Sequence, residues 1–326
     1  MAVIFQATPP APRPMPPERG GTKRRTGGLS QRELDLLRLI DRLYKLEPEQ
    51  VRRRFFGRSL SHVQELLKRL TLERGLLYRG IETARYRFGN IPYVYSLSQQ
   101  GVDALADLGL IERRRVRRAD PSHLFWDHLR IGNDFWIGLE LLAQRHPTTV
   151  QIADRLHEEQ LKRQRLSVEV EKGLPPAKQH ATVTPDAWFE LYLGARHEEG
   201  QFWVEIDHNS EDQRQWRGKI QAMVAAFLPQ GHHKQSVYQQ RYRIQCPDRI
   251  LVVAAPDDPA DTALRLRNLR HWTTLELGRV GHPDFGDHFL FTGLNPATVE
   301  PEAFFFEPAW VTPSDDTQLR LLEGAA

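Results

Sequence analysis

The chain has 326 residues, of which 40% are hydrophobic and 27% charged, a balance typical of soluble globular proteins. No stretch approaches the run of about 18 apolar residues that a membrane span needs, so the sequence excludes a transmembrane protein. The single cysteine, Cys246, excludes an internal disulfide and a cysteine-based zinc site, and the N-terminus lacks an apolar signal core. These features predict a cytoplasmic protein.

The net charge of +3 conceals an uneven distribution. Residues 1–120 contain 24 Lys and Arg against 13 Asp and Glu, whereas the remaining residues contain 21 against 29. A basic front part attracts polyanions, and an acidic back part can present carboxylates to a cation. Ordinary variation of charge between domains is the alternative explanation.

Residues 1–29 are rich in proline and basic side chains and are expected to be a disordered arm. After the arm, Ser30 and Glu33 have the spacing of a capping box at the start of an amphipathic helix. The pattern over residues 30–110 then predicts two more helices, a β-hairpin and a last helix, at 47–56, 59–75, 76–88 with 93–101, and 99–110.

Three helices, a hairpin and a closing helix make a winged helix-turn-helix, and "YVYSLSQQGVDALADLG" resembles the passage from wing to last helix of many such domains. In this fold the third helix enters the major groove of double-stranded DNA, and hairpin arginines lie near phosphates, often in a homodimer. A helical protein–protein module is the alternative. The expected DNA contacts are Ser59, Ser61, His62, Gln64, Lys68, Arg69, Arg79, Arg85 and Arg87.

A basic segment over 111–121, which contains "IERRRVRRAD", follows as a linker. A dense run of like charges is usually a solvated linker. Because this run joins a predicted DNA-binding domain to an acidic one, Arg113 and Arg114 are also expected to contact the DNA backbone.

Residues 122–295 alternate helices with strands, which predicts an α/β domain with a sheet covered on both faces. Residues 296–326 are a C-terminal tail, whose "EAFFFEPAW" is either a strap on the core or a docking segment. The expected elements are a long helix from 122, a strand at 148–156, an insertion or hairpin at 157–180, strands at 181–193 and 200–208, a helix at 212–228, a buried strand at 249–255, a helix at 261–275 and a strand at 288–294.

The strand "FWVEIDH" carries two carboxylates where apolar side chains are usual. Alternation places Glu205 and Asp207 on one face and His208 on the other. Asp186, which follows Pro185 at the start of the neighbouring strand, can converge on them. Because neighbouring carboxylates repel, three of them suit Mg²⁺ or Mn²⁺, and an ion held there can activate water for phosphodiester hydrolysis. A polar, solvated strand face is the alternative.

Pro185-Asp186, the Glu205-x-Asp207 strand and the α-β-β-β-α-β order over about 122–255 resemble the PD-(D/E)XK nuclease superfamily. The resemblance implies that Asp186 and Glu205 are metal ligands, with Glu140 as a further carboxylate. Asp207 occupies the position of the motif's lysine, so Lys219 on the next helix is the candidate replacement. His128 and Asn133 are expected to pack or form hydrogen bonds.

A winged helix followed by "HLRIGNDFW", "PDAWFEL", "FWVEIDHNSE" and a "KI" helix also resembles the replication-relaxation family, over about 30–295. The resemblance implies a DNA-binding protein of a plasmid or other mobile element, which works with replication or mobile-element proteins. The leading hypothesis is a Mg²⁺-dependent nickase or endonuclease. The alternatives are a non-catalytic regulator with a degenerate nuclease-like domain, and a nuclease subunit of a transposition or defence complex.

Overall fold

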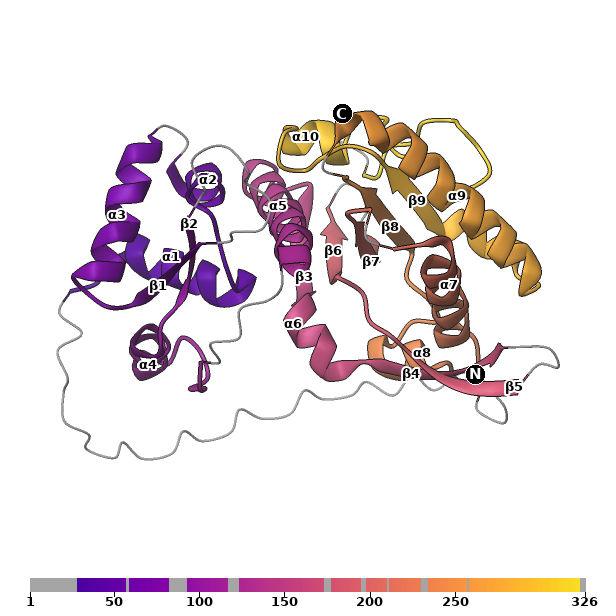
Figure 1. Ribbon diagram of the computed structural model, residues 1–326, viewed down its shortest axis with the longest axis horizontal. Coiled ribbons are helices and arrows are strands. Elements are labelled where there is room, and N and C mark those ends of the chain that lie inside the picture. Colours follow the sequence, from indigo (N-terminus) through magenta and orange to yellow (C-terminus); the bar gives the residue numbers. More distant parts are fainter. Residues whose placement is uncertain are drawn as a thin grey trace, which may run out of the picture.

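The structure is a computed structural model with a helical front part and a back part built on a mixed β-sheet (Figure 1). None of the helices within the described residues is long and apolar enough to cross a bilayer. Most of the predicted N-terminal arm, together with Arg85 and Arg87, lies outside the described residues. The described residues are 28–56, 59–81, 93–116, 123–172, 177–194, 198–209, 211–229, 234–256 and 258–322.

The front part contains four α-helices, a π-helical turn and a two-stranded antiparallel hairpin among its described residues. Ser30 and Glu33 form the predicted capping box, since the Glu33 amide donates to Ser30 Oγ and the Ser30 amide to Glu33 Oε2. The elements are α1 (Gln31–Leu43), α2 (Pro48–Val51), the π-helical turn η1 (Arg52–Phe56), α3 (Leu60–Leu72), β1 (Leu77–Ile81), β2 (Tyr93–Leu97) and α4 (Gln99–Asp107).

The back part is a five-stranded mixed sheet in the order β3-β6-β7-β8-β9. The pairs β3–β6 and β6–β7 are antiparallel, while β7–β8 and β8–β9 are parallel and are joined through helices. Its elements are α5 (His123–Arg145), β3 (Val150–His157), α6 (Glu158–Leu161), η2 (Lys162–Gln164), β4 (Leu166–Lys172), β5 (Ala177–Val183), β6 (Ala187–Leu193), β7 (Glu198–Asp207), α7 (Gln213–Phe227), α8 (Val237–Tyr242), β8 (Arg249–Ala254), η3 (Pro259–Asp261), α9 (Thr262–Arg279), η4 (Pro283–His288), β9 (Phe289–Thr292) and α10 (Pro301–Phe305).

Helices cover both faces of this sheet (Figure 1). Val204 and Ile206 of β7 pack with α5 and α10, whereas Trp203 packs with α7 and α9. The alternation predicted for β7 is therefore confirmed, and it directs Glu205 and Asp207 toward the α7 and α9 side.

The segment 181–193 was expected to be one strand, and this expectation is wrong. β5 ends at Val183 and pairs with β4 in a separate hairpin, whereas β6 begins at Ala187 in the main sheet. Pro185 has no amide hydrogen to donate to a ladder, so the break falls beside it. Asp186 therefore lies immediately before β6.

Two segments outside the expected helices and strands also contribute to the core. The polar stretch before β8 contains α8, whose Tyr238 and Tyr242 are buried against the α7 and α9 side of the sheet. In the C-terminal tail, Phe304, Phe305 and Trp310 are buried against α5, so the aromatic segment is a strap on the core.

The front part packs directly on α5. Arg53 of η1 forms an ion pair of 2.7 Å with Asp134, and the Gln50 side chain donates to the carbonyl of Arg130. One hydrophobic cluster continues from α1, α3 and α4 through α5 to the sheet. The front part and the back part therefore share one hydrophobic core, which holds them together.

Candidate functional site

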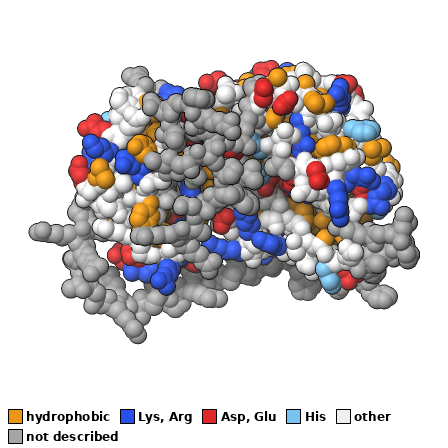
Figure 2. All heavy atoms as spheres, viewed as in Figure 1, with side chains coloured by type: hydrophobic (Ala, Val, Ile, Leu, Met, Phe, Trp, Pro, Cys, Tyr) orange, Lys and Arg blue, Asp and Glu red, His pale blue; other side chains and the backbone are white. Residues whose placement is uncertain are grey.

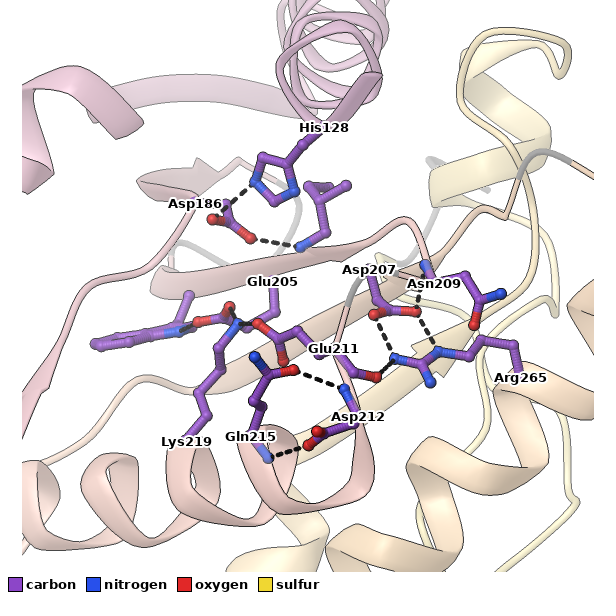
Figure 3. Close-up of polar contacts among 12 residues, drawn as sticks. His128, Asp186, Glu205, Asp207, Asn209, Glu211, Asp212, Gln215, Lys219 and Arg265 are labelled. Carbon is purple, nitrogen blue, oxygen red and sulfur yellow. Dashed lines mark hydrogen bonds and ion pairs between the residues drawn. The ribbon is translucent and has the colours of Figure 1, made fainter. Parts of the chain in front are cut away.

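The break before β6 positions Asp186 between two sheet strands and α5. Its amide donates to the carbonyl of Val204 at 3.0 Å, and the amide of Ile206 donates to Asp186 Oδ2 at 2.7 Å. The other oxygen, Oδ1, lies 2.9 Å from Nε2 of His128 (Figure 3). Burial alone would raise the pKa of Asp186, but the charge of His128 and these hydrogen bonds lower the pKa to about 2.

His128 reaches Asp186 from α5 (Figure 3). Burial would lower the pKa of the imidazole, but the adjacent Asp186 carboxylate raises it to about 9. His128 is therefore an imidazolium at neutral pH and supplies the positive charge next to Asp186. The sequence predicted only a packing or hydrogen-bonding role for His128. The signal that could have indicated more was a polar residue inside an apolar helical pattern.

Glu158, at the start of α6, completes a cluster that the sequence did not reveal. Glu158, His128 and Asp186 each place one ligand atom within 4.8 Å of the other two. Burial raises the pKa of Glu158, as does the negative charge of Asp186, while Lys162 Nζ lies 2.6 Å from its Oε1. Glu158 was missed because residues 157–180 had no periodicity that fixed which side chains point inward.

The cluster has a donor set that fits a hard divalent ion. Carboxylate oxygens are the ligands that Mg²⁺ and Mn²⁺ prefer, and an imidazole nitrogen favours Mn²⁺ over Mg²⁺. His128 has to release its proton before its nitrogen can bind a metal, so protons compete with the ion for this site.

Glu205 and Lys219 form an ion pair next to this cluster, in which Glu205 is buried and Lys219 is partly exposed. Lys219 Nζ lies 2.9 Å from Glu205 Oε2 and 2.5 Å from a carboxylate oxygen of Glu211, while Trp203 Nε1 donates to Glu205 Oε1. Burial raises the pKa of Glu205, which is 0% exposed, and the Lys219 ammonium opposes that rise. Burial would lower the pKa of Lys219, but Glu205, Asp186 and Glu211 raise it, so Lys219 is an ammonium.

Asp207 does not join these carboxylates, although it shares a strand face with Glu205. Arg265 of α9 holds it with two bonds, Nε to Oδ2 at 2.5 Å and Nη2 to Oδ1 at 2.6 Å (Figure 3). Arg265 also donates to the carbonyl of Glu211 at 2.7 Å. The expected convergence of three carboxylates is therefore incomplete, because an arginine from a distant helix neutralises the third.

Glu140 is also placed away from the cluster. It pairs with Arg42 of α1, with Arg54 of η1 at 2.9 Å and with Arg155 of β3 at 2.8 Å. Glu140 lies twelve positions after His128 on α5, and this spacing corresponds to about 18 Å along the helix axis. The expectation that Glu140 is a metal ligand is therefore wrong. Its ion pairs instead connect α1 and η1 to α5 and β3.

A pocket of about 1300 Å³ opens above the cluster, between the β4–β5 hairpin, α7 and the end of α9. Glu158, Asp186 and Lys219 are among its lining residues. Basic side chains outnumber acidic ones around it, which favours an anionic ligand. The basic residues are Lys162, Arg165, Arg214, Arg217, Lys219 and Arg279.

The predicted DNA contacts of α3 are exposed. Ser59 caps the helix by accepting from the amide of His62, and the outward side of α3 carries Ser61, His62, Gln64 and Lys68. Arg69 is half-exposed and pairs with Glu33 at 3.0 Å. A polar, exposed helix face of this kind is available to a groove.

The remaining predicted arginines lie around the hairpin and the linker. The Arg79 guanidinium lies 4.3 Å from the centre of the Tyr93 ring. Arg113 pairs with Asp107, and Arg114 pairs with Asp41 at 2.6 Å. Arg79 and Arg114 line one pocket, whereas Arg113 is held against α4.

No curated protein and no solved structure matches the chain. A family model described as replication-relaxation matches residues 37–236, which include α3, His128, Glu158, Asp186, Glu205 and Lys219. The match covers more than half of the chain. The chain therefore belongs to the replication-relaxation family, and membership of this family suggests a role in plasmid or mobile-element replication or relaxation.

Proposed function

We propose that the protein binds double-stranded DNA through its front part and nicks it with a divalent ion held at the Asp186 cluster. The front part would act as a winged helix-turn-helix, with α3 in the major groove and the β1–β2 hairpin as the wing. The order of α5, β3, β6, β7, α7 and β8 supports a restriction-endonuclease-like unit, with α6, η2 and the β4–β5 hairpin as insertions.

One observation carries the catalytic part of the proposal. Lys219 approaches Glu205 to 2.9 Å, and it lines the same basic pocket as Asp186 and Glu158. A cationic side chain beside carboxylates is what phosphodiester hydrolysis requires, because negative charge builds on the phosphoryl oxygens in the transition state.

Each side chain has a distinct task in this scheme. A divalent ion, when bound, would activate water and stabilise the developing charge. Asp186, which stays ionised because its pKa is low, would hold the ion together with Glu158 and His128. The Lys219 ammonium would orient the scissile phosphate, and the arginines around the pocket would hold the neighbouring phosphates.

Supercoiled plasmid incubated with the protein and Mn²⁺ or Mg²⁺ tests this proposal. The expected result is metal-dependent conversion to open circles, which Asp186→Asn and Glu158→Gln each abolish. Asp284→Asn is the matched control, because Asp284 is an exposed carboxylate that lies outside the three-residue cluster and does not line this pocket. Nicking that survives Asp186→Asn, or that needs no metal, would refute the assignment.

Two observations favour a non-catalytic regulator as the second candidate. Glu205 is fully buried in its pair with Lys219, and Arg265 occupies both oxygens of Asp207. If DNA is bound and shifted but never nicked, with or without metal, the back part binds DNA or replication proteins without cutting. Activity that appears only with added mobile-element proteins would instead identify a nuclease subunit.

A further inference from the structure

A second pocket, of about 1050 Å³, lies between the β1–β2 hairpin, the end of α1 and the α6–η2 segment. None of the predicted catalytic side chains lines it. Six basic residues surround it against two acidic ones, Asp41 and Glu159. The basic residues are Lys45, Arg79, Arg114, Arg115, Lys162 and Arg163.

Two of these cations are available to a ligand. Arg115 and Arg163 are exposed, and neither has an ion-pair partner within the described part of the chain. Figure 2 shows Lys and Arg side chains gathered over α6 and the beginning of β4, below the centre of the face. Solvated cations of this kind bind phosphates with an affinity that falls as the salt concentration rises.

Aromatic rings accompany the cations. Tyr44, which follows α1, and Tyr78 of β1 both line this second pocket, and Tyr78 is partly exposed. Rings interleaved with cations form the sites on which single-stranded nucleic acids stack their bases. At about 1050 Å³, the second pocket has the size of a small-ligand cavity, which suits a few nucleotides of one strand rather than a duplex.

The α6–η2 segment separates the two pockets and contributes to both. Glu158 lines the pocket that contains Asp186, Arg163 lines the second pocket, and Lys162 lines both. Lys162 also pairs with Glu158 at 2.6 Å, so the cation at the junction is fixed beside the candidate metal cluster. Lys162 thus connects the linings of the two pockets.

We propose that one unpaired DNA strand runs from the second pocket, past Lys162, to the pocket that contains Asp186. This inference rests on the proposed function, since it assigns the strand that the cluster would cut. Bases stack on Tyr44 and Tyr78, and the phosphates lie along Arg115, Arg163 and Lys162. The duplex on α3 and the strand in these pockets are then two separate contacts of one protein.

Fluorescence anisotropy of the full chain with labelled oligothymidylate, in EDTA, tests the strand path. Arg163→Glu and Arg115→Glu are expected to weaken single-strand binding and to reduce its salt slope by about 0.7 for each lost phosphate contact. Tyr78→Ala is expected to weaken it about tenfold, the size of one lost base stack, while Tyr78→Phe keeps it. Arg267→Glu, which changes an exposed charge on α9 outside both pockets, is the control and leaves binding unchanged.

The outcomes separate this inference from the proposed nicking. Unchanged single-strand affinity in all three test variants overturns the path even if plasmid is nicked. Equal losses for a matched duplex overturn the assignment of a single strand. Weakened single-strand binding supports the path even if the wild type never nicks plasmid, in which case only the catalytic proposal fails.

Discussion

Replacing Arg265 with methionine removes the cation that faces Asp207 inside the protein. Asp207 is 1% exposed and Arg265 6% exposed, and two short hydrogen bonds join them. The substitution leaves a carboxylate with little access to water and without its partner. Removing one member of such a pair typically costs about 3–5 kcal/mol, and the bond from Arg265 to the carbonyl of Glu211 is lost as well.

A double-mutant cycle measures this interaction. The free energy of unfolding is obtained from urea titrations at neutral pH for the wild type, Arg265→Met, Asp207→Leu and the double variant. Each single change is expected to cost about 3–5 kcal/mol, whereas the double variant, which buries no unpaired charge, should cost less than about 2 kcal/mol.

The cycle also decides what Asp207 does. If Arg265→Met costs less than about 1 kcal/mol, the pair behaves like a solvated one. The pair also behaves like a solvated one if the free energy of unfolding of the double variant is no higher than that of the single variants. Asp207 would then be free to bind a cation with Glu205, and its assignment as a structural residue would be refuted.

Three further predictions concern other buried charges. Burial raises the pKa of Glu47 to about 7, so keeping this carboxylate ionised costs stability at high pH. Glu47→Gln should therefore stabilise the protein by about 3 kcal/mol at pH 8, and the gain should shrink as the pH falls from 7 to 4.5. Urea titrations at pH 8 and pH 4.5 measure this difference. Glu140→Ala leaves three arginines without their carboxylate, and should lower the free energy of unfolding by about 2–4 kcal/mol in a urea titration. The folded variant should still nick plasmid. Loss of nicking without loss of stability would restore Glu140 as a metal ligand. Lys219→Met leaves Glu205 uncompensated and should lower the nicking rate at least about 100-fold, whereas an unchanged rate in a plasmid assay would remove Lys219 from the site.

Local patterns in the sequence predicted local features of the structure well. The alternation in β7 identified Glu205 as facing away from Val204, because a strand turns successive side chains to opposite faces whatever its neighbours are. Ser30 capped its helix for the same reason, since a capping box involves only four consecutive residues. The resemblance to the nuclease superfamily named Lys219 as the candidate lysine, and the structure brings it to Glu205.

The partners of those side chains depend on segments that are distant in sequence. Asp207 meets Arg265, 58 residues later, and no local pattern indicates which helix will cover that part of the sheet. Glu158 lies in a stretch without periodicity, so its approach to Asp186 could not be predicted without knowing the path of α6. The two tyrosines of α8 were likewise hidden in a polar stretch, because packing rather than composition buries them.

The most direct test of the central claim is a titration of the full chain with Mn²⁺, followed by electron paramagnetic resonance of the free ion. The cluster of His128, Glu158 and Asp186 predicts one bound ion per chain, which Asp186→Asn abolishes and Asp207→Asn does not. It also predicts weaker binding at lower pH, since protons compete for His128. No uptake by the wild type, or uptake that is lost with Asp207→Asn and kept with Asp186→Asn, would contradict the account.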